Sequence, residues 1–307
     1  MIHGVINVYK EKGYTSHDVV AKLRGIVGQK KIGHTGTLDP DATGVLPVCL
    51  GKATKLCDML TDKHKSYETV MLLGTVTDTQ DVSGKVLSNC ATEQICEKDV
   101  KDAILSFLGD YEQIPPMYSA LKVNGQKLYD LARQGIEVER KARKIHIFAI
   151  QIKEISLPRV RMEVTCSRGT YIRTLCHDIG EKLGCGACME ELVRTEVAPF
   201  SIKDSVTLSE IQTAKEQDML DKYLVPIDAM FSSCEAVTLQ EENLSLVYNG
   251  NSFLPKHLKQ KVTLTDQKVV RVYDHKGNFV ALYKFCKDSY VFKIEKMFFE
   301  RENNAVH

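Results

Sequence analysis

The 307-residue chain has almost no excess of charge of one sign, because 41 lysines and arginines oppose 40 aspartates and glutamates. Bulk charge therefore gives no argument for a nucleic-acid partner, and any such surface must come from local clustering. There is no apolar run long enough to span a bilayer and no signal-peptide pattern at Met1 to Gly4. We expect a cytoplasmic protein without membrane contact. Internal repeats and low-complexity stretches are also absent.

A disulfide framework is missing too, since the ten cysteines are scattered along the chain, as suits reduced thiols in the cytoplasm. Cys185 and Cys188 have the spacing of metal ligands, with Cys176-His177 upstream. Zinc normally needs two such pairs around a compact knuckle, and neighbouring residues in a helical pattern point to different sides. We expect no metal and no cofactor.

The most informative stretch is Gly33–Lys55, GHTGTLDPDATGVLPVCLGKATK, with four glycines, two prolines and only two acids. Glycine and proline fix unusual backbone geometry, so the stretch is predicted to be a shaped loop. Pro40 biases Asp39 towards an extended conformation. A carboxylate held in this way suits a nucleophile or general base, although a lone Asp-Pro more often only starts a turn.

Two better-known loop types compete for this stretch. A phosphate-binding P-loop fails, because Leu46 stands where glycine is required and Ala53 follows Gly51-Lys52. Asp39-Pro-Asp41-Ala-Thr43 fits the signature of phosphatases that form an aspartyl phosphate. In those enzymes a buried hydrophobic strand leads in, whereas the residues before Asp39 are polar and rich in glycine. The phosphatase stays open as an alternative.

The stretch resembles the signature of the TruB family of tRNA pseudouridine synthases, Gly-His-x-Gly-x-Leu-Asp-Pro-x-Ala-x-Gly-x-Leu, and every fixed position is present. The resemblance implies that Asp39 is the catalytic nucleophile and that His34 enters the RNA when the target base swings out. It also assigns RNA contacts to Gly36 and Thr37 in the same signature.

A second family signature is Ser167-Arg-Gly-Thr-Tyr-Ile-Arg173, where Tyr171 is expected to contact the substrate. Arg173 offers a planar, permanently charged fork, and its obvious partner is Asp39. By resemblance, Tyr67 stacks on the flipped uracil and Leu192 lines the uracil pocket. From the residues alone, Arg173 would be a surface arginine, and Tyr67 and Leu192 would be core residues.

Residues 115–145 are predicted to form an insertion that grips RNA, with a hairpin at Asn124-Gly125. Between Tyr118 and Lys144, seven basic residues oppose three acidic ones, although a solvated basic face has the same composition. The residues of this insertion expected to contact RNA are Lys141, Arg143 and Lys144. Near the N-terminus the family pattern Asp-Lys-Pro-x-Gly-x-Thr-Ser is only partly kept, and its Lys10 could approach an RNA phosphate.

The fold class predicted is α+β. Strands cluster with intervening helices, and the resemblance implies a pseudouridine-synthase fold with a mixed, largely antiparallel sheet. Residues 1–232 form the predicted catalytic domain. In residues 233–307, many short strands with turn signals resemble a small PUA-like β-barrel that binds RNA.

The resemblance implies an enzyme that isomerises uridine-55 in the TΨC loop of tRNA to pseudouridine by flipping the base out. The partner is the T-arm of tRNA, and we expect a monomer. Nothing is oxidised and no atom is added, so the chemistry requires no cofactor. A catalytically inactive RNA-binding or RNA-chaperone protein is the third possibility, because the fold would suffice for it.

Overall fold

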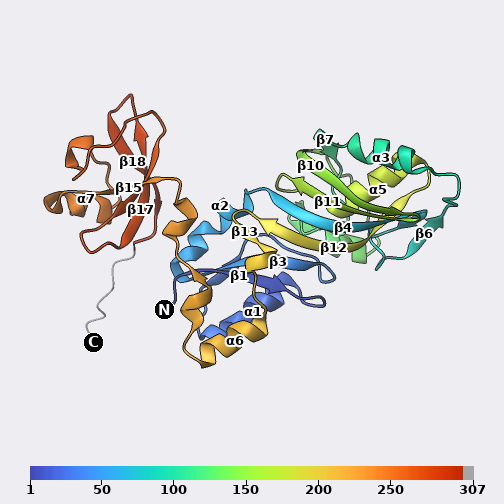
Figure 1. Ribbon diagram of the computed structural model, residues 1–307, viewed down its shortest axis with the longest axis horizontal. Coiled ribbons are helices and arrows are strands. Elements are labelled where there is room, and N and C mark those ends of the chain that lie inside the picture. Colours follow the sequence, from blue (N-terminus) through green and yellow to red (C-terminus); the bar gives the residue numbers. More distant parts are fainter. Residues whose placement is uncertain (300–307) are drawn as a thin grey trace.

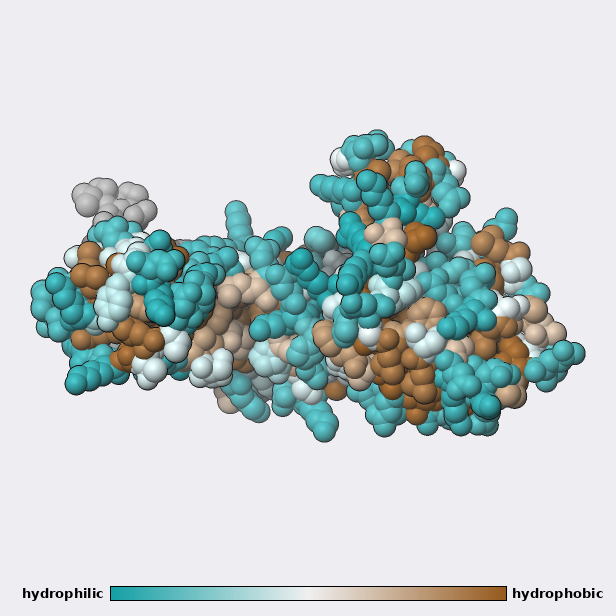
Figure 2. Space-filling model, turned by 90° about the horizontal axis from the view of Figure 1, so that it is seen from above, coloured by the Kyte–Doolittle hydropathy of each residue, from teal (hydrophilic) through white to brown (hydrophobic). Residues whose placement is uncertain are grey.

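The computed structural model describes residues 1–299, so residues 300–307 of the predicted C-terminal domain lie outside the described part. Two β units are seen, a large one and a small C-terminal one at the end of an elongated molecule (Figure 1). Figure 2, which views the molecule from above, shows hydrophilic residues interspersed with hydrophobic patches over both units. Within residues 1–299, no helix is long and apolar enough to cross a membrane.

The large unit is built on a ten-stranded sheet with one parallel pair, β12 with β3. The main path runs in the order β14 (Leu224–Val225), β1 (Gly4–Lys10), β3 (Thr43–Leu50), β12 (Ala187–Val197), β4 (Lys65–Leu73), β11 (Arg159–Cys166), β10 (Arg143–Ser156) and β7 (Gly109–Gln113). β2 (Ile32–His34) pairs with β3, and β13 (Phe200–Ser201) pairs with β12. The prediction of a mixed, largely antiparallel sheet is confirmed.

Helices cover the two halves of this sheet and enclose two hydrophobic cores. α1 (Ser16–Val27) and α6 (Leu208–Glu216) lie over the half containing β1 and β3, and α5 (Ile172–Leu183) and α3 (Glu97–Leu105) lie over the other half (Figure 1). α1 begins with a capping box between Thr15 and Asp18, as its sequence favours.

The smaller elements connect these layers. They are η1 (Gly51–Leu56), α2 (Cys57–Thr61), β5 (Thr75–Thr77), β6 (Val86–Asn89), β8 (Lys122–Val123), β9 (Gln126–Lys127), α4 (Leu128–Arg133), η2 (Ile202–Asp204), η3 (Leu220–Tyr223) and η4 (Asp228–Phe231). β8 and β9 form the predicted hairpin, with positive φ at both Asn124 and Gly125.

The prediction that Gly33–Lys55 is one loop is wrong, because strand β3 and the last two residues of β2 lie within it. Gly44 is needed at a close approach, since a Cβ atom there would lie 2.2 Å from the carbonyl oxygen of Arg194. Pro47 is tolerated in β3 because of the direction in which it faces. Its carbonyl accepts from the Thr35 amide at 3.1 Å, and the N–H that proline lacks would point to the same side, towards the turn after β2. The shaped loop is therefore only residues 35–42.

The small unit has the strand order β15 (Glu235–Thr238), β16 (Val269–Tyr273), β17 (Phe279–Cys286) and β18 (Val291–Met297). Its remaining elements are η5 (Glu241–Asn243), α7 (Leu244–Tyr248) and η6 (Pro255–His257). Leu282 and Phe298 share a hydrophobic cluster with Val5 and Val45, so the unit packs against the large sheet. This architecture is consistent with the expected PUA-like fold.

Candidate active site

The structure brings Asp39 and Arg173 into direct contact, as predicted. Asp39 lies in the turn between β2 and β3, and Arg173 lies in the first turn of α5. Arg173 Nε lies 3.1 Å from Asp39 Oδ2, and Nη2 donates to Oδ1 at 3.4 Å. The Arg173 side chain is 6% exposed, whereas the Asp39 side chain is 42% exposed. Arg173 therefore contacts Asp39 from the interior of the protein and leaves the carboxylate accessible to a ligand.

Arg173 also bonds to Asp81, whose role the sequence did not distinguish from that of Asp78. Arg173 Nη1 lies 3.4 Å from Asp81 Oδ2, and Asp81 Oδ1 accepts from the amide of Ser83. Asp78 instead accepts from the Lys85 amide. Further guanidinium bonds reach the carbonyls of Thr79 and Tyr118. Arg173 is therefore held between two carboxylates and cannot swing away from Asp39 without breaking several bonds.

Burial raises the pKa of Asp39 above that of an ordinary aspartate, and Arg173 opposes this effect. A carboxylate with a raised pKa is a stronger base and a better nucleophile than a solvated one. The site therefore combines a partly desolvated carboxylate with a fixed cation.

The backbone around Asp39 is fixed by the N-terminal segment. The Leu38 amide donates to Ser16 Oγ at 2.9 Å, and the Pro40 carbonyl accepts from the Gly13 amide. The Pro40 carbonyl also accepts from Lys10 Nζ at 3.0 Å. The residues on both sides of Asp39 are thus bound to a second segment, so the carboxylate has a defined position.

Tyr67 on β4 is 8% exposed and lies opposite Arg194 of β12 in the antiparallel register. The Arg194 guanidinium acts electrostatically on the tyrosine hydroxyl, and so, more weakly, does the Asp39 carboxylate. Burial raises the pKa of Tyr67 to about 12. Tyr67, Asp39 and Arg173 thus occupy one site. The sequence did not indicate Arg194 as a site residue, because a charged residue within a strand is normally expected to face the solvent.

His34, at the end of β2, is half-buried and packs edge-on against His17, with 5.3 Å between ring centroids. Burial lowers the pKa of His34, so its imidazole is neutral near pH 7. Gly36 follows with φ +98°, and Thr37 is exposed. These three predicted RNA contacts therefore lie along one turn. His17, on α1, carried no sequence signal of its own.

Tyr171 and Leu192 are both half-buried. Tyr171 precedes α5, and its backbone exchanges two hydrogen bonds with the side chain of Gln113, at 2.8 and 3.0 Å. Leu192 on β12 packs at the edge of the larger core and pairs with Thr69 of β4. Both side chains retain surface that a ligand could cover.

Comparison with known proteins decides the family. Residues 24–172 match the family profile described as "TruB family pseudouridylate synthase (N terminal domain)". A second profile, "tRNA pseudouridylate synthase B C-terminal domain", matches residues 173–232. The chain belongs to the TruB family of pseudouridylate synthases.

Several relatives within the TruB family cover nearly the whole chain. A protein named tRNA pseudouridine synthase B from Lachnoclostridium phytofermentans is 48% identical over 97% of this chain and 100% of its own length. A relative of the same name from Clostridium tetani is 45% identical over 96% of this chain and 99% of its own length.

Solved structures support the TruB fold assignment. A chain in the structure of an H/ACA RNP bound to a substrate RNA containing 2′-deoxyuridine superposes with a TM-score of 0.73 and 26% identity, covering 98% of this chain and 86% of that one. A chain of a Cbf5-Nop10-Gar1 complex gives the same TM-score with 28% identity, covering 97% and 86%.

Lys10 does not lie where the TruB resemblance suggested. It is fully buried, and its ammonium donates to the carbonyls of Glu11, Tyr14 and Pro40. Burial lowers its pKa to about 8. The prediction that Lys10 contacts an RNA phosphate is contradicted, because all three donors point into the protein. Lys10 instead fixes the turn that carries Asp39.

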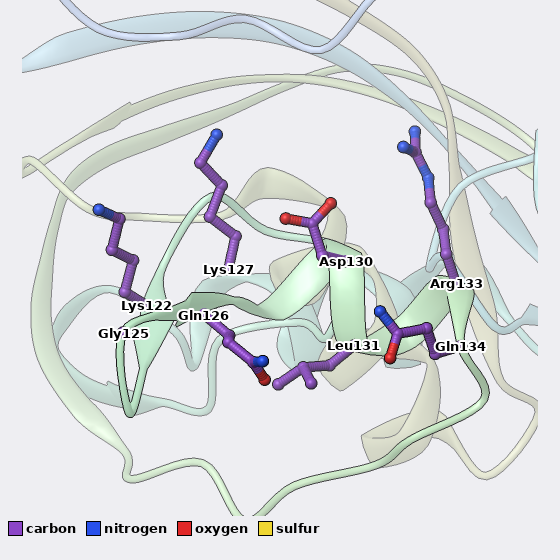
Figure 3. Close-up of a pocket in the computed structure, with 8 residues that line it drawn as sticks. All are labelled: Lys122, Gly125, Gln126, Lys127, Asp130, Leu131, Arg133 and Gln134. Atoms are coloured by element: carbon purple, nitrogen blue, oxygen red, sulfur yellow. The ribbon is translucent and has the colours of Figure 1, made fainter.

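The basic insertion begins at the site itself, since the Tyr118 carbonyl accepts from Arg173. Lys141, Arg143 and Lys144 are exposed, but Lys144 pairs with Asp110 at 2.8 Å. A second basic surface surrounds a pocket of about 590 Å³ on β8, β9 and α4. Figure 3 shows three cationic side chains projecting to one side of it, Lys122, Lys127 and Arg133. We call these three residues the pocket cations.

The cysteines with metal-like spacing are buried among apolar residues. Cys176, Cys185 and Cys188 are all buried, and burial raises the pKa of each thiol. Throughout the described residues 1–299, no group of three or more potential ligands among His, Cys, Asp and Glu is arranged to hold a metal ion.

Proposed function

We propose that this protein converts uridine-55 in the TΨC loop of tRNA to pseudouridine. Membership of the TruB family and the names of the nearly full-length relatives support pseudouridylation of tRNA. The position in the tRNA, the flipping of the base and the use of Asp39 are our further proposals.

The observation that carries the proposal is the Asp39 carboxylate, partly exposed above a buried guanidinium that is bonded to a second carboxylate. The isomerisation breaks the bond from C1′ to N1, turns the base, and joins C1′ to C5. The C5–H bond then breaks, its electron pair forms the C5–C6 double bond, and N1 takes up a proton. Atoms and electrons are conserved, so the work left to the protein is positioning, a carboxylate and proton transfer.

Each residue of the site has a proposed role in this sequence. Asp39 attacks the sugar, removes a proton at C2′, or adds to the base, and these three routes stay open. Arg173 orients Asp39 through its two-nitrogen contact. Tyr67 stacks on the uracil and presents its hydroxyl to the proton that leaves C5. His34, neutral and at the rim, occupies the gap that the flipped base leaves in the RNA.

RNA binding is assigned to the basic surfaces beyond the site. Lys141, Arg143 and the pocket cations are exposed on the insertion, which is tied to the site through Tyr118. Tyr129 lies between two of the pocket cations, 5.2 Å from Lys127 and 5.4 Å from Arg133, and can stack on a base there. We also assign RNA contacts to the C-terminal unit, from its PUA-like architecture.

The test is to incubate the protein with an unmodified tRNA transcript and map pseudouridine at single-nucleotide resolution. We expect modification at position 55 and no other, and none in a transcript with cytidine there. Modification elsewhere would refute the site assignment. Tight binding without pseudouridine would favour an RNA-binding protein, and release of phosphate from an ester would favour the phosphatase.

A further inference from the structure

Arg194 is among the largest fully buried side chains of the protein, with 1% of its surface exposed. Its Nε donates to the Val45 carbonyl at 2.7 Å, and Nη2 donates to the Gly36 carbonyl at 3.2 Å. Arg194 therefore connects β12 to β3 and to the turn that leads to Asp39.

Among residues 1–299, no carboxylate pairs with this guanidinium. The phenol of Tyr67 is its cross-strand neighbour in the β12–β4 ladder, and the charged side chains that act on it, Lys10 and Lys65, are themselves cations. Burying an unpaired cation is costly, and apolar residues of similar volume would fill the same space at lower cost. The two carbonyls satisfy part of the guanidinium, but they leave its positive charge without a counter-charge among the described residues.

The chemistry of the proposed reaction gives the cation a use. Tyr67 Oη first gives up its own proton, which N1 takes up, and the phenolate then takes the proton from C5, so the phenol is restored and no proton is gained or lost overall. Between these two transfers the oxygen carries negative charge. A fixed cation beside the oxygen stabilises that charge, and its effect is large where water is excluded.

We propose that Arg194 is a positioning residue that acts through Tyr67: its guanidinium fixes the phenol oxygen and stabilises the charge on it while the proton leaves C5. This inference rests on the proposed function and goes beyond it, since neither Asp39 nor Arg173 is involved. Burial raises the pKa of Tyr67 to about 12, and Arg194 opposes this rise by favouring the phenolate.

The test separates the C5 step from the earlier steps by means of the substrate. An RNA stem-loop with 5-fluorouridine at the target position cannot lose a proton from C5, so its consumption reports only on the steps before. In single turnovers, Arg194→Lys is expected to slow conversion of the uridine RNA at least about tenfold and to leave consumption of the fluorinated RNA within about twofold. Arg161→Lys, at an arginine of β11 whose side chain is 41% exposed, is the matched control and should change neither rate.

The second arm uses Tyr67→Phe, which keeps the ring in the core and therefore folds even if Arg194 variants do not. It should slow only the uridine RNA, and adding Arg194→Lys should cause no further loss, because the hydroxyl is already absent. Equal slowing of both RNAs by Tyr67→Phe or by Arg194→Lys, or losses that add in the double variant, would overturn the inference. Failure of the proposed function is distinguishable, since the wild-type protein would then convert no uridine RNA.

Discussion

Two nitrogens of Arg173 contact the two oxygens of Asp39, joining residues that lie 134 positions apart in the chain. The contact connects the start of α5 to the turn between β2 and β3, so the site forms only when both elements are folded. Because Arg173 is buried and Asp39 is partly exposed, the pair presents one carboxylate to the solvent in a fixed orientation.

Replacement of Arg173 by lysine tests whether the fork itself matters. Lysine keeps the charge but cannot reach both oxygens of Asp39 while also bonding to Asp81 and two carbonyls. We expect kcat to fall at least about a hundredfold, with the melting temperature lowered by only a few degrees. Single-turnover rates and thermal denaturation give the two quantities. A loss of stability large enough to account for the loss of rate would make Arg173 a structural residue.

The raised pKa of Asp39 makes a prediction about stability against pH. Its folded-state pKa lies above the unfolded value, so the group favours folding below the unfolded pKa, and this contribution is lost as pH rises through the folded pKa. At neutral pH the ionised carboxylate therefore destabilises the fold. Asp39→Asn should melt at a higher temperature than the wild-type protein at pH 7. This difference in melting temperature should shrink as the pH is lowered towards the pKa of an ordinary aspartate. A lower melting temperature of the variant at pH 7 would show that the contact with Arg173 outweighs burial.

Much of the site was predictable because its residues stand in two contiguous signatures. Asp39, His34 and Arg173 were assigned from sequence, and the structure places Asp39 and Arg173 in contact. The mixed sheet was predictable as well, because its strands are separated by recognisable helices and turns.

The remainder depended on contacts between distant segments. Lys10 was expected to approach an RNA phosphate, since nothing local reveals that three carbonyls surround its ammonium. Arg194 faces the site only after β12 has paired with β4, and Asp81 is positioned by a bridge to Met189 of β12. Strand β3 was not predicted because glycine and proline usually disfavour strands. In the fold, Gly44 lies against the Arg194 backbone and the Pro47 carbonyl accepts from Thr35, so both residues fit within the strand.

The basic insertion can be tested through the salt dependence of tRNA binding. Changing the pocket cations Lys122, Lys127 and Arg133 to alanine should flatten the slope of log affinity against log salt by about two to three phosphate contacts. Changing Lys141, Arg143 and Lys144 should remove about two, because Lys144 is partly neutralised by Asp110. A triple change at Lys203, Lys215 and Lys222, outside the insertion, is the control. If both insertion variants keep the wild-type slope, these residues are only solvated.

The redox-neutral chemistry predicts that activity needs no divalent metal. Treatment with a chelator should leave initial rates unchanged on a stem-loop substrate, provided that the RNA is folded beforehand and its structure is checked after chelation. Loss of activity that zinc or magnesium restores, with the RNA still folded, would contradict the prediction that no metal is needed. The buried cysteines would then have to be tested as metal ligands.

The most direct measurement is pseudouridine formation by Asp39→Asn on a tRNA that the variant still binds. The amide is nearly isosteric with the carboxylate, so the turn fixed by Ser16 and Lys10 should survive. It is a far poorer nucleophile and base, and it cannot pair ionically with Arg173. We expect tRNA affinity within about tenfold of wild type and turnover lower by several powers of ten. Turnover near the wild-type rate would contradict the account, because Asp39 would then be only a turn residue.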